Sequence, residues 1–441
     1  GEKVIAGSLN YDGFIKYKAE KIGKESTISE IVRLVIEASN TKAPIAKIAD
    51  KISGYFVPVV ILIAIITFII YLILGYDISV AISTFVTILV VACPCSLGLA
   101  TPLAIVVSEG VCVNNGILVK KSEVLENASK TNTIVFDKTG TLTYGKLKIS
   151  KIYNYSELDN DQLIQIVGSI EEKSTHPIGK AFTDYMEAKK QEKKEVKTFE
   201  NVAGYGIVGT IENDEIILGN RKIVEKYNIQ NEHIEDENRL TLDGNSIIYV
   251  IRNKKIIALI GVNDIVRENA KEVIEKMNNK NIQTIMLTGD NNQTAEKIAS
   301  ELGITKVISN VLPVQKAEIV ENLQQEKKMV MMCGDGINDS LAITKANIGV
   351  SVKSGTDIAM DSADVILTKN DLNSILKLIE ISKRTIRNIK QNLFWAFFYN
   401  ILMIPIGILK PIGISINPMW ASLAMVVSSL TVTLNALRLK K

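Results

Sequence analysis

Four long apolar runs constrain this chain more than any other feature. They cover residues 55–74, 78–107, 391–409 and 414–436. A helix of roughly 20 apolar residues is long enough to cross the hydrocarbon core of a bilayer, and none of the four runs contains Asp, Glu, His, Lys or Arg. We therefore predict an integral membrane protein with four transmembrane helices in the lipid bilayer.

Basic residues gather at one end of every run. Lys47 and Lys51 precede the first run, and Lys120 and Lys121 follow the second. The later runs are flanked by Lys383, Arg384, Arg387, Lys390, Arg438, Lys440 and Lys441. The positive-inside rule then places the long segment between the two pairs of runs in the cytoplasm. The formal net charge of the 441 residues is only +3, which gives no electrostatic reason to expect nucleic acid as a partner.

The second run is interrupted by the sequence Cys93-Pro94-Cys95. Proline lacks an N–H and opens the helix at the preceding turn, and opened helices near the bilayer midplane are where transporters bind their cargo. Two thiolates select soft ions, such as Cu(I), or Zn²⁺ and its heavier relatives. The interruption predicts a metal site but leaves the metal open.

Polar and thioether side chains in the last two runs favour a monovalent ion. The candidates are Tyr399, Asn400, Met425 and Ser429. Zinc usually completes its coordination with nitrogen or carboxylate oxygen, which the apolar runs lack, whereas a thioether favours Cu(I). Packing in the core or against lipid is the alternative for Met425. Helix packing through small residues is the alternative for Ser428 and Ser429.

The cytoplasmic segment contains two kinds of sequence pattern. The stretches "TNTIVFDKTG", "IQTIMLTGD", "MVMMCGDG" and "ADVIL" are short apolar strands between helices, the pattern of a doubly wound α/β sheet. We predict one α/β domain from residues 128–147 and 261–372. Residues 148–260 are more polar and are predicted to form an inserted α+β domain, with helices first and strands after.

Asp137 directly follows an apolar strand and is expected at the carboxyl end of the sheet, where α/β folds bind ligands. A carboxylate there, next to Lys138 and Thr139, suits nucleophilic attack on a phosphoryl group. Later segments, expected to end strands at the same edge, supply Thr288, Gly289, Asp290, Lys316, Asp335, Asn338 and Asp339. Their carboxylates suit Mg²⁺, and the set offers the positioning and charge neutralisation that phosphoryl transfer requires.

At these residues the chain resembles a known family. "DKTGT", "TGD" and "GDGIND" are similar to the signatures of P-type ATPases, whose phosphorylation domain is haloacid dehalogenase-like, and "CPC" with "STHP" resembles the heavy-metal subclass. The resemblance implies that Asp137 is phosphorylated and that Asp137, Thr139 and Asp335 hold Mg²⁺. Phosphate contacts would come from Thr288, Lys316 and Asn338.

The resemblance also assigns the insertion to nucleotide binding. It implies an ATP site at Glu171, His176, Gly204, Gly206 and Asn220. From the residues alone this is much weaker, because "GYGIVG" lies in strand-like sequence and a single histidine is more often structural.

The Tyr-Asn and Met-x-x-Ser-Ser patterns resemble those of the Cu(I)/Ag(I) group of this subclass. This implies ATP-driven transport of Cu⁺, or of Ag⁺, out of the cytoplasm across the cell membrane of a prokaryote, with a cytosolic chaperone or thiol as copper donor. Two alternatives stay open: a Zn²⁺ or Cd²⁺ pump of the same superfamily, and a non-pumping phosphatase or regulatory fragment.

The resemblance extends over essentially the whole chain, with several departures. Residues 1–27 are expected to be the C-terminal remnant of an actuator domain, because its Thr-Gly-Glu loop is absent, so the chain is expected to be N-terminally incomplete. The further expected parts are a linker helix (28–54), a helix pair with the CPC motif (55–109), a helix leading into the membrane (373–390) and a second pair (391–437). Cys112 and Cys333 are expected to be structural.

Overall fold

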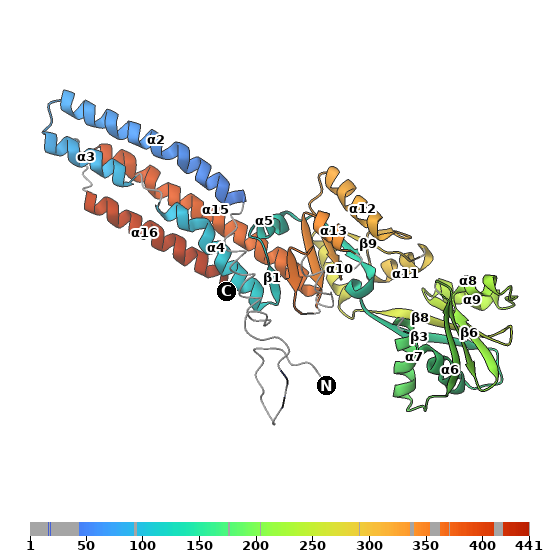
Figure 1. Ribbon diagram of the computed structural model, residues 1–441. Helices are drawn as coiled ribbons and strands as arrows, with labels where there is room; N and C mark the ends of the chain where they lie inside the picture. Colours follow the sequence, from blue (N-terminus) through green and yellow to red (C-terminus); the bar gives the residue numbers. More distant parts are fainter. Residues whose placement is uncertain are drawn as a thin grey trace. The chain divides into compact units, whose positions relative to one another are not determined.

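The structure is a computed structural model (Figure 1). It describes residues 16, 18, 44–91, 95–174, 177–202, 204–290, 292–335, 339–352, 362–369, 371–409 and 418–440. Almost all of the expected actuator remnant and most of the expected linker helix lie outside the described residues, as do Cys93, His176 and Asn338. The chain forms two compact units. We call them the helical unit (1–131, 347–353 and 363–441) and the α/β unit (132–346 and 354–362).

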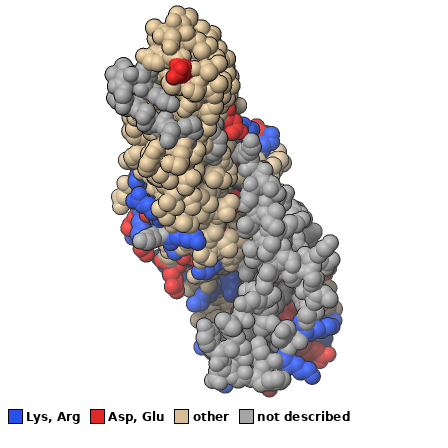
Figure 2. Space-filling view, turned by 90° about the vertical axis from the view of Figure 1, so that its left-hand side faces the viewer, with Lys and Arg blue, Asp and Glu red and all other residues tan. Residues whose placement is uncertain are grey.

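Long helices dominate the helical unit. They are α2 (Pro44–Ile73), α3 (Ile78–Val91), α4 (Cys95–Asn114), α15 (Asn373–Ile408) and α16 (Pro418–Leu437). In the described part of the chain, four helical segments are long and apolar enough to cross a membrane, with α3 and α4 together forming one of them. Figure 2 shows one face of this bundle, whose surface is almost free of charged side chains, with Lys and Arg gathered near one end.

Small side chains let the helices approach closely. Ala64, Ala81 and Ala421 are fully buried between helices, as expected where helix packing in a membrane depends on close contact. Gly75 has a φ of +79° and makes the turn after α2, a conformation that glycine adopts without steric cost. α15 is one continuous helix that contains both the segment expected to lead into the membrane and the third apolar run.

The helical unit also contains three short strands and a short helix. They are β1 (Ile117–Val119), α5 (Glu123–Lys130), β12 (Ile348–Val352) and β13 (Val365–Leu367). β13 pairs with β1 in the antiparallel and with β12 in the parallel direction. α15 begins six residues after β13 ends, so this sheet and the helix that leads into the membrane are joined by a short segment.

A parallel sheet forms the first layer of the α/β unit. Its strands lie side by side in the order β11 (Val330–Gly334), β2 (Thr133–Asp137), β9 (Gln283–Leu287) and β10 (Lys306–Ile308). All three pairings are parallel. The helices that follow the strands are α10 (Ala270–Asn279), α11 (Asn292–Leu302), α12 (Pro313–Gln325) and α13 (Ser340–Lys345). β2, β9 and β11 are the strands expected from the sequence, and all parallel strands of such a sheet end at one edge.

The second sheet is antiparallel. Its strand order is β3 (Thr143–Asn154), β8 (Lys255–Val266), β7 (Ser246–Arg252), β6 (Asp214–Gly219), β5 (Gly206–Ile211) and β4 (Val196–Val202). The helices between these strands are α6 (Asn160–Glu171), α7 (Pro177–Ala188), α8 (Arg221–Lys226) and α9 (Ile234–Leu242). The expected order of helices first and strands after is therefore incomplete, because the 12-residue strand β3 precedes the helices and pairs with the last strand, β8.

Side chains of the second sheet alternate between two cores. Leu218 and Val250 pack with α6 and α7 on one face, whereas Ile217 and Ile251 pack with α8 and α9 on the other. This alternation follows from the two-residue period of a strand. The inserted domain is thus a sheet covered by helices on both faces.

Candidate active site

Asp137 is the last residue of β2 and is buried at the edge where the parallel strands end. The chain then makes a tight loop, η2 (Lys138–Leu142), in which Thr139 is extended and Gly140 has a φ of +74°. A Cβ at Gly140 would lie 3.1 Å from both Cβ and Oδ2 of Asp335. Glycine is required here for two reasons: the backbone is left-handed, and the Asp335 side chain occupies the space.

Lys316 joins two buried carboxylates. Its Nζ donates to Asp137 Oδ1 at 2.5 Å and to Asp339 Oδ1 at 2.7 Å. The sequence analysis placed Lys316 at a strand end, which is wrong: it lies in the first turns of α12, after Pro313 at the start of the helix. Proline is favoured at this position because its missing N–H would be unpaired in any case.

The charges of this group perturb one another. Burial, followed by the charge of Asp339, raises the pKa of Asp137 to about 7, against the opposing charge of Lys316. Burial opposes the charge on Lys316, but Asp137 and Asp339 outweigh it and raise the Lys316 pKa. A lysine between two carboxylates stays protonated and can neutralise a phosphoryl oxygen.

The neighbouring strand supplies the next part of the site. Lys138 Nζ donates to Asp290 Oδ2 at 2.5 Å, which ties the loop after β2 to the loop after β9. Thr288 is buried, and its hydroxyl accepts a hydrogen bond from the Asp290 backbone N–H at 3.1 Å. Gly289 lies between them, and a Cβ there would meet only Val311 O at 3.5 Å.

The acidic side chains fit a Mg²⁺ ion. Asp339 Oδ2 is buried and has no hydrogen-bond partner among the described residues. It lies against Gly334, where a Cβ would approach it to 2.7 Å. In the described part of the chain no three His, Cys, Asp or Glu side chains form a closed metal cage. Mg²⁺ in phosphoryl-transfer sites is held by one or two carboxylates together with substrate phosphates.

Three residues that the sequence analysis missed hold the loop after β2. Arg267 is buried, and its guanidinium donates to Thr141 O at 2.6 Å and to Gly140 O at 2.7 Å. Thr143 Oγ1 lies 2.5 Å from Asp264 Oδ2 and accepts from Gly140 N. The only sign of these residues in the sequence is an acidic and a basic residue three positions apart, with Asp264 near the end of β8 and Arg267 directly after it.

A separate cavity of about 260 Å³ lies in the inserted domain. Glu171, Gly204, Gly206 and Asn220, four of the residues expected at the nucleotide, line it together. Asn220 caps α8 by accepting from Lys222 N, and its Nδ2 donates to Gly204 O at 3.1 Å. A Cβ at Gly206 would lie 2.0 Å from Leu218 O, so the sheet can close around the cavity only with glycine there.

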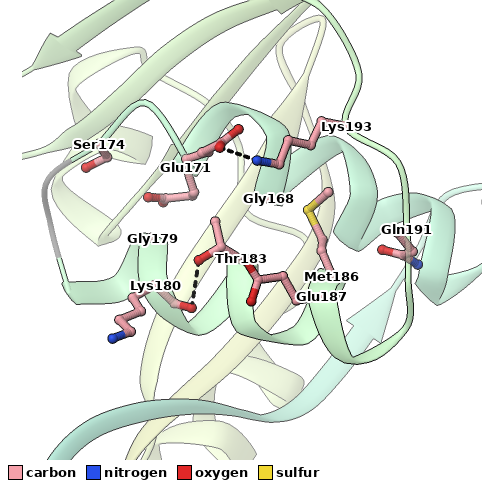
Figure 3. Close-up of a pocket in the computed structure, with 11 residues that line it drawn as sticks. Gly168, Glu171, Ser174, Gly179, Lys180, Thr183, Met186, Glu187, Gln191 and Lys193 are labelled. Atoms are coloured by element: carbon pink, nitrogen blue, oxygen red, sulfur yellow. Dashed lines mark hydrogen bonds and ion pairs between the residues drawn. The ribbon is translucent and has the colours of Figure 1, made fainter. Parts of the chain in front are cut away.

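Glu171 also lines a second cavity of about 480 Å³ between α6 and α7. Figure 3 shows Thr183 and Met186 of α7 directed toward α6, with Lys180 directed away from it. Burial raises the pKa of Glu171 to about 7. This carboxyl is therefore partly protonated near neutral pH.

The residues expected at the transported metal lie on packed helices. Asn400 is buried on α15, and Tyr399, Met425 and Ser429 are half-buried on α15 and α16. Ser428, beside Ser429, shares a hydrogen bond of 3.0 Å with Ser96, the residue after Cys95. The Cys95 side chain is outside the described part. Cys112 and Cys333, expected to be structural, are fully buried free thiols.

Comparison with known proteins matches this arrangement. A haloacid dehalogenase-like hydrolase family covers residues 131–347. The chain is 42% identical to a copper-exporting P-type ATPase of Staphylococcus haemolyticus, over 99% of this chain and 54% of that protein. It is 41% identical to the protein of the same name from Staphylococcus aureus, again over 54% of its length. The chain thus spans about half the length of these relatives.

Solved structures agree. A zinc-transporting PIB-type ATPase in its E2.Pi state has a TM-score of 0.80 and 28% identity, over 95% of this chain and 68% of that chain. The catalytic domain of the CPx-ATPase CopB-B has 31% identity and a TM-score of 0.52, over 62% of this chain and 98% of that one.

The chain belongs to the PIB-type, or heavy-metal, P-type ATPases. The predicted family and the predicted fold class are both confirmed, because the parallel sheet with Asp137 is the haloacid dehalogenase-like domain of this family. The protein is an integral membrane protein of this family, and its α/β unit is on the cytoplasmic side.

Proposed function

We propose that this chain transports Cu⁺, with Ag⁺ as a second substrate, out of the cytoplasm at the expense of ATP and through a phosphorylated Asp137. One observation carries the proposal. A buried aspartate at the end of β2 is bonded to Lys316, which also bonds to Asp339, in a chain whose second apolar run includes the sequence Cys93-Pro94-Cys95. The relatives' copper-exporting names support the same substrate.

The chemistry follows from the charges. An Asp137 carboxylate oxygen attacks the γ-phosphorus of ATP, a new P–O bond forms, and the bond to the β-phosphate oxygen breaks to release ADP. Lys316 neutralises charge on the transferred group, and Thr288 offers a hydroxyl to it. Asp137, Thr139 and Asp335 would hold Mg²⁺, which would supply charge neutralisation and favour ionised Asp137. Asn338 is proposed to contact the transferred phosphate, and Asp339 accepts a hydrogen bond from Lys316.

ATP is proposed to bind at the 260 Å³ cavity of the inserted domain. Gly204 and Gly206 let the backbone approach the nucleotide, and Asn220 fixes the Gly204 carbonyl. Glu171 and His176 are proposed to contact the base. Lys138, Gly289 and Asp290 are proposed to hold the phosphorylation loop open to the incoming γ-phosphate, since the Lys138–Asp290 pair joins the two loops.

The chemistry of the membrane helices favours Cu⁺ over Zn²⁺. Cys93, Cys95 and Met425 are soft ligands, with Tyr399, Asn400 and Ser429 as polar neighbours, and the apolar runs contain no carboxylate or imidazole. A Zn²⁺ pump is the second candidate, because the zinc-transporting structure matches 95% of this chain. A cytosolic chaperone or thiol is proposed to deliver Cu⁺, since free Cu⁺ is bound strongly by thiolates.

The test is labelling of the purified chain with γ-³²P-ATP, with Cu⁺, Zn²⁺ or no metal. We expect labelling that Cu⁺ stimulates, that Asp137→Asn abolishes, and that Cys93→Ala with Cys95→Ala makes independent of metal. Labelling that survives Asp137→Asn would refute the assigned chemistry. Stimulation by Zn²⁺ alone would establish the second candidate, and hydrolysis of small phosphate esters without metal stimulation would indicate a phosphatase.

A further inference from the structure

Three asparagines form a hydrogen-bond cluster where α4, α15 and α16 meet. They are Asn388 and Asn392 of α15 and Asn435 of α16, and we call them the amide cluster. Asn392 is fully buried and Asn388 is 5% exposed. A buried amide without partners is costly in an apolar setting, so a cluster of three requires a reason.

Every polar atom of Asn392 is used. Its Nδ2 donates to Ala100 O of α4 at 3.1 Å and to Asn388 Oδ1 at 3.2 Å, while its Oδ1 accepts from Asn435 Nδ2 at 2.8 Å. Asn388 Nδ2 in turn donates to Asn435 O at 2.7 Å. A fully satisfied buried network of this kind specifies one arrangement of its elements. Sliding α4 along α15 would break the bond to Ala100 O, and sliding α16 would break the two bonds that join it to Asn392 and Asn388.

The cluster lies close along the helices to the proposed metal residues. Ala100 is five residues from Cys95, or about 7.5 Å along α4 at 1.5 Å per residue. Asn392 shares the buried face of α15 with Asn400, eight residues or about 12 Å further on. Pro102 of α4 lacks the N–H that would bond to the carbonyl four residues earlier, which weakens the helix on both sides of Ala100.

We propose that the amide cluster is a positioning device that holds α4 in register with α15 and α16. It thereby fixes the start of α4, where Cys95 and Ser96 lie, against Ser428 of α16. Asn392 is the central member because it alone contacts the other two helices through side-chain bonds on both sides. Resting on the proposed function, the consequence is that the cluster sets the Cu⁺ concentration at which phosphorylation of Asp137 is stimulated.

The register can be measured directly at Ser96 and Ser428, whose hydroxyl oxygens are 3.0 Å apart. In the chain with Cys93→Ser and Cys95→Ser, the changes Ser96→Cys and Ser428→Cys create a pair that we expect to form a disulfide on mild oxidation. Disulfides require specific geometry. Adding Asn392→Leu should slow the disulfide at least about tenfold, because small displacements of reacting groups cost large rate factors.

Two further variants keep the result decisive. Asn114→Leu makes the same chemical change at the exposed last residue of α4, away from the cluster, and should leave the rate unchanged. Asn435→Leu removes the donor to Asn392 from the other helix, should also slow the disulfide, and serves if Asn392→Leu does not fold. Disulfide rates that stay within about threefold of the parent, a range too small for a displaced thiol pair, in both asparagine variants would overturn the proposal.

A second readout separates positioning from general damage. In the chain with its native cysteines, Asn392→Leu should raise the Cu⁺ concentration for half-maximal ³²P labelling about tenfold, while the ATP concentration for half-maximal labelling stays unchanged. Equal loss in both would indicate a purely structural role and overturn the proposal. Absence of Cu⁺-stimulated labelling in the parent chain would refute the proposed function, and the disulfide rates alone would then decide this inference.

Discussion

The proposed phosphorylation site and the cavity proposed to bind the nucleotide lie in the same unit but are built in different ways. At the phosphorylation site, Lys316 lies between the buried carboxylates of Asp137 and Asp339, so ionised side chains determine the geometry. At the cavity, three of the lining residues are glycines, Gly204, Gly206 and Gly219, so there the backbone itself faces the space. One site therefore depends on the identity of its charges, and the other depends on the absence of side-chain atoms.

This difference predicts which substitutions each site tolerates. Removing a charge should damage the phosphorylation site most, because each buried charge there is paired with a charge of opposite sign. Adding a methyl group should damage the cavity most, because close backbone approach leaves it no room. The four predictions below test this contrast, beginning with the largest effect.

The largest effect is expected for Lys316→Met. It leaves Asp137 and Asp339 buried without their cation, so the free energy of unfolding should fall by about 3–5 kcal/mol, and ³²P labelling should disappear. Urea unfolding of the chain in detergent, followed by circular dichroism, measures the first effect. Lys328→Met is the matched control, because Lys328 pairs with Glu326 on the surface at 2.8 Å and should change stability by about 0–1 kcal/mol. Similar losses in both variants would contradict the contrast.

The next effect compares two glycines of the cavity. Gly206→Ala would place a Cβ 2.0 Å from Leu218 O and should cost about 2–4 kcal/mol through strain and overpacking. Gly204→Ala has a φ of +81° but meets nothing within 4 Å, so it should cost about 1 kcal/mol. Binding of a fluorescent ATP analogue should weaken much more for Gly206→Ala. Equal weakening would mean that the backbone conformation, and not the available space, determines the cavity.

A smaller effect concerns pH at Glu171, whose pKa burial raises to about 7. The folded state binds its proton more tightly than the unfolded state does, so this contribution to stability is complete at pH 4 and is lost as pH rises through 7. The loss between pH 5 and pH 8 should be about 2–3 kcal/mol. Glu171→Gln should remove this dependence in thermal unfolding scans, whereas Glu172→Gln, at an exposed neighbour, should keep it. A pH dependence that persists in Glu171→Gln would show that another group is responsible.

The smallest effect is expected at an ion pair between a helix of the parallel-sheet part and the inserted domain. Lys297 Nζ of α11 lies 3.2 Å from Asp243 Oδ1 in the turn after α9, and both side chains are partly exposed. A double-mutant cycle with Lys297→Met and Asp243→Asn should give a coupling of about 0.2–1 kcal/mol that decreases with added salt. A coupling above about 2 kcal/mol is well outside the range for exposed ion pairs. It would mean that this contact joins the parallel-sheet part and the inserted domain more tightly than a surface ion pair does.

Much of the fold could be predicted because its signals are local. Apolar runs locate the membrane helices, and β2, β9 and β11 are short apolar segments followed by polar site residues. β10 has only three residues, which is too short for a periodic pattern to identify it. Lys316 was assigned to a strand end although Pro313, three residues earlier, is a typical helix start.

The unpredicted parts of the sites depend on contacts between distant segments. Arg267 supports the loop after Asp137 from 126 positions further along the chain, and no spacing rule connects the two. The amide cluster is similar: its three asparagines lie in helix-forming sequence, but which helix faces meet is decided by packing. His176, Asn338 and Cys93, which lie outside the described residues, remain sequence predictions.

The paired strands β3 and β8 have a mechanical consequence. Their pairing begins at Thr143 and Val266, directly after the loop that follows β2. Their register shifts between Thr143 and Leu147. Such an irregularity bends a strand, and a two-stranded ribbon flexes easily out of its own plane while resisting stretch within it. Because Arg267, Thr143 and Asp264 connect this bend to the loop after β2, a change in the direction of the two strands would also displace the backbone next to Asp137.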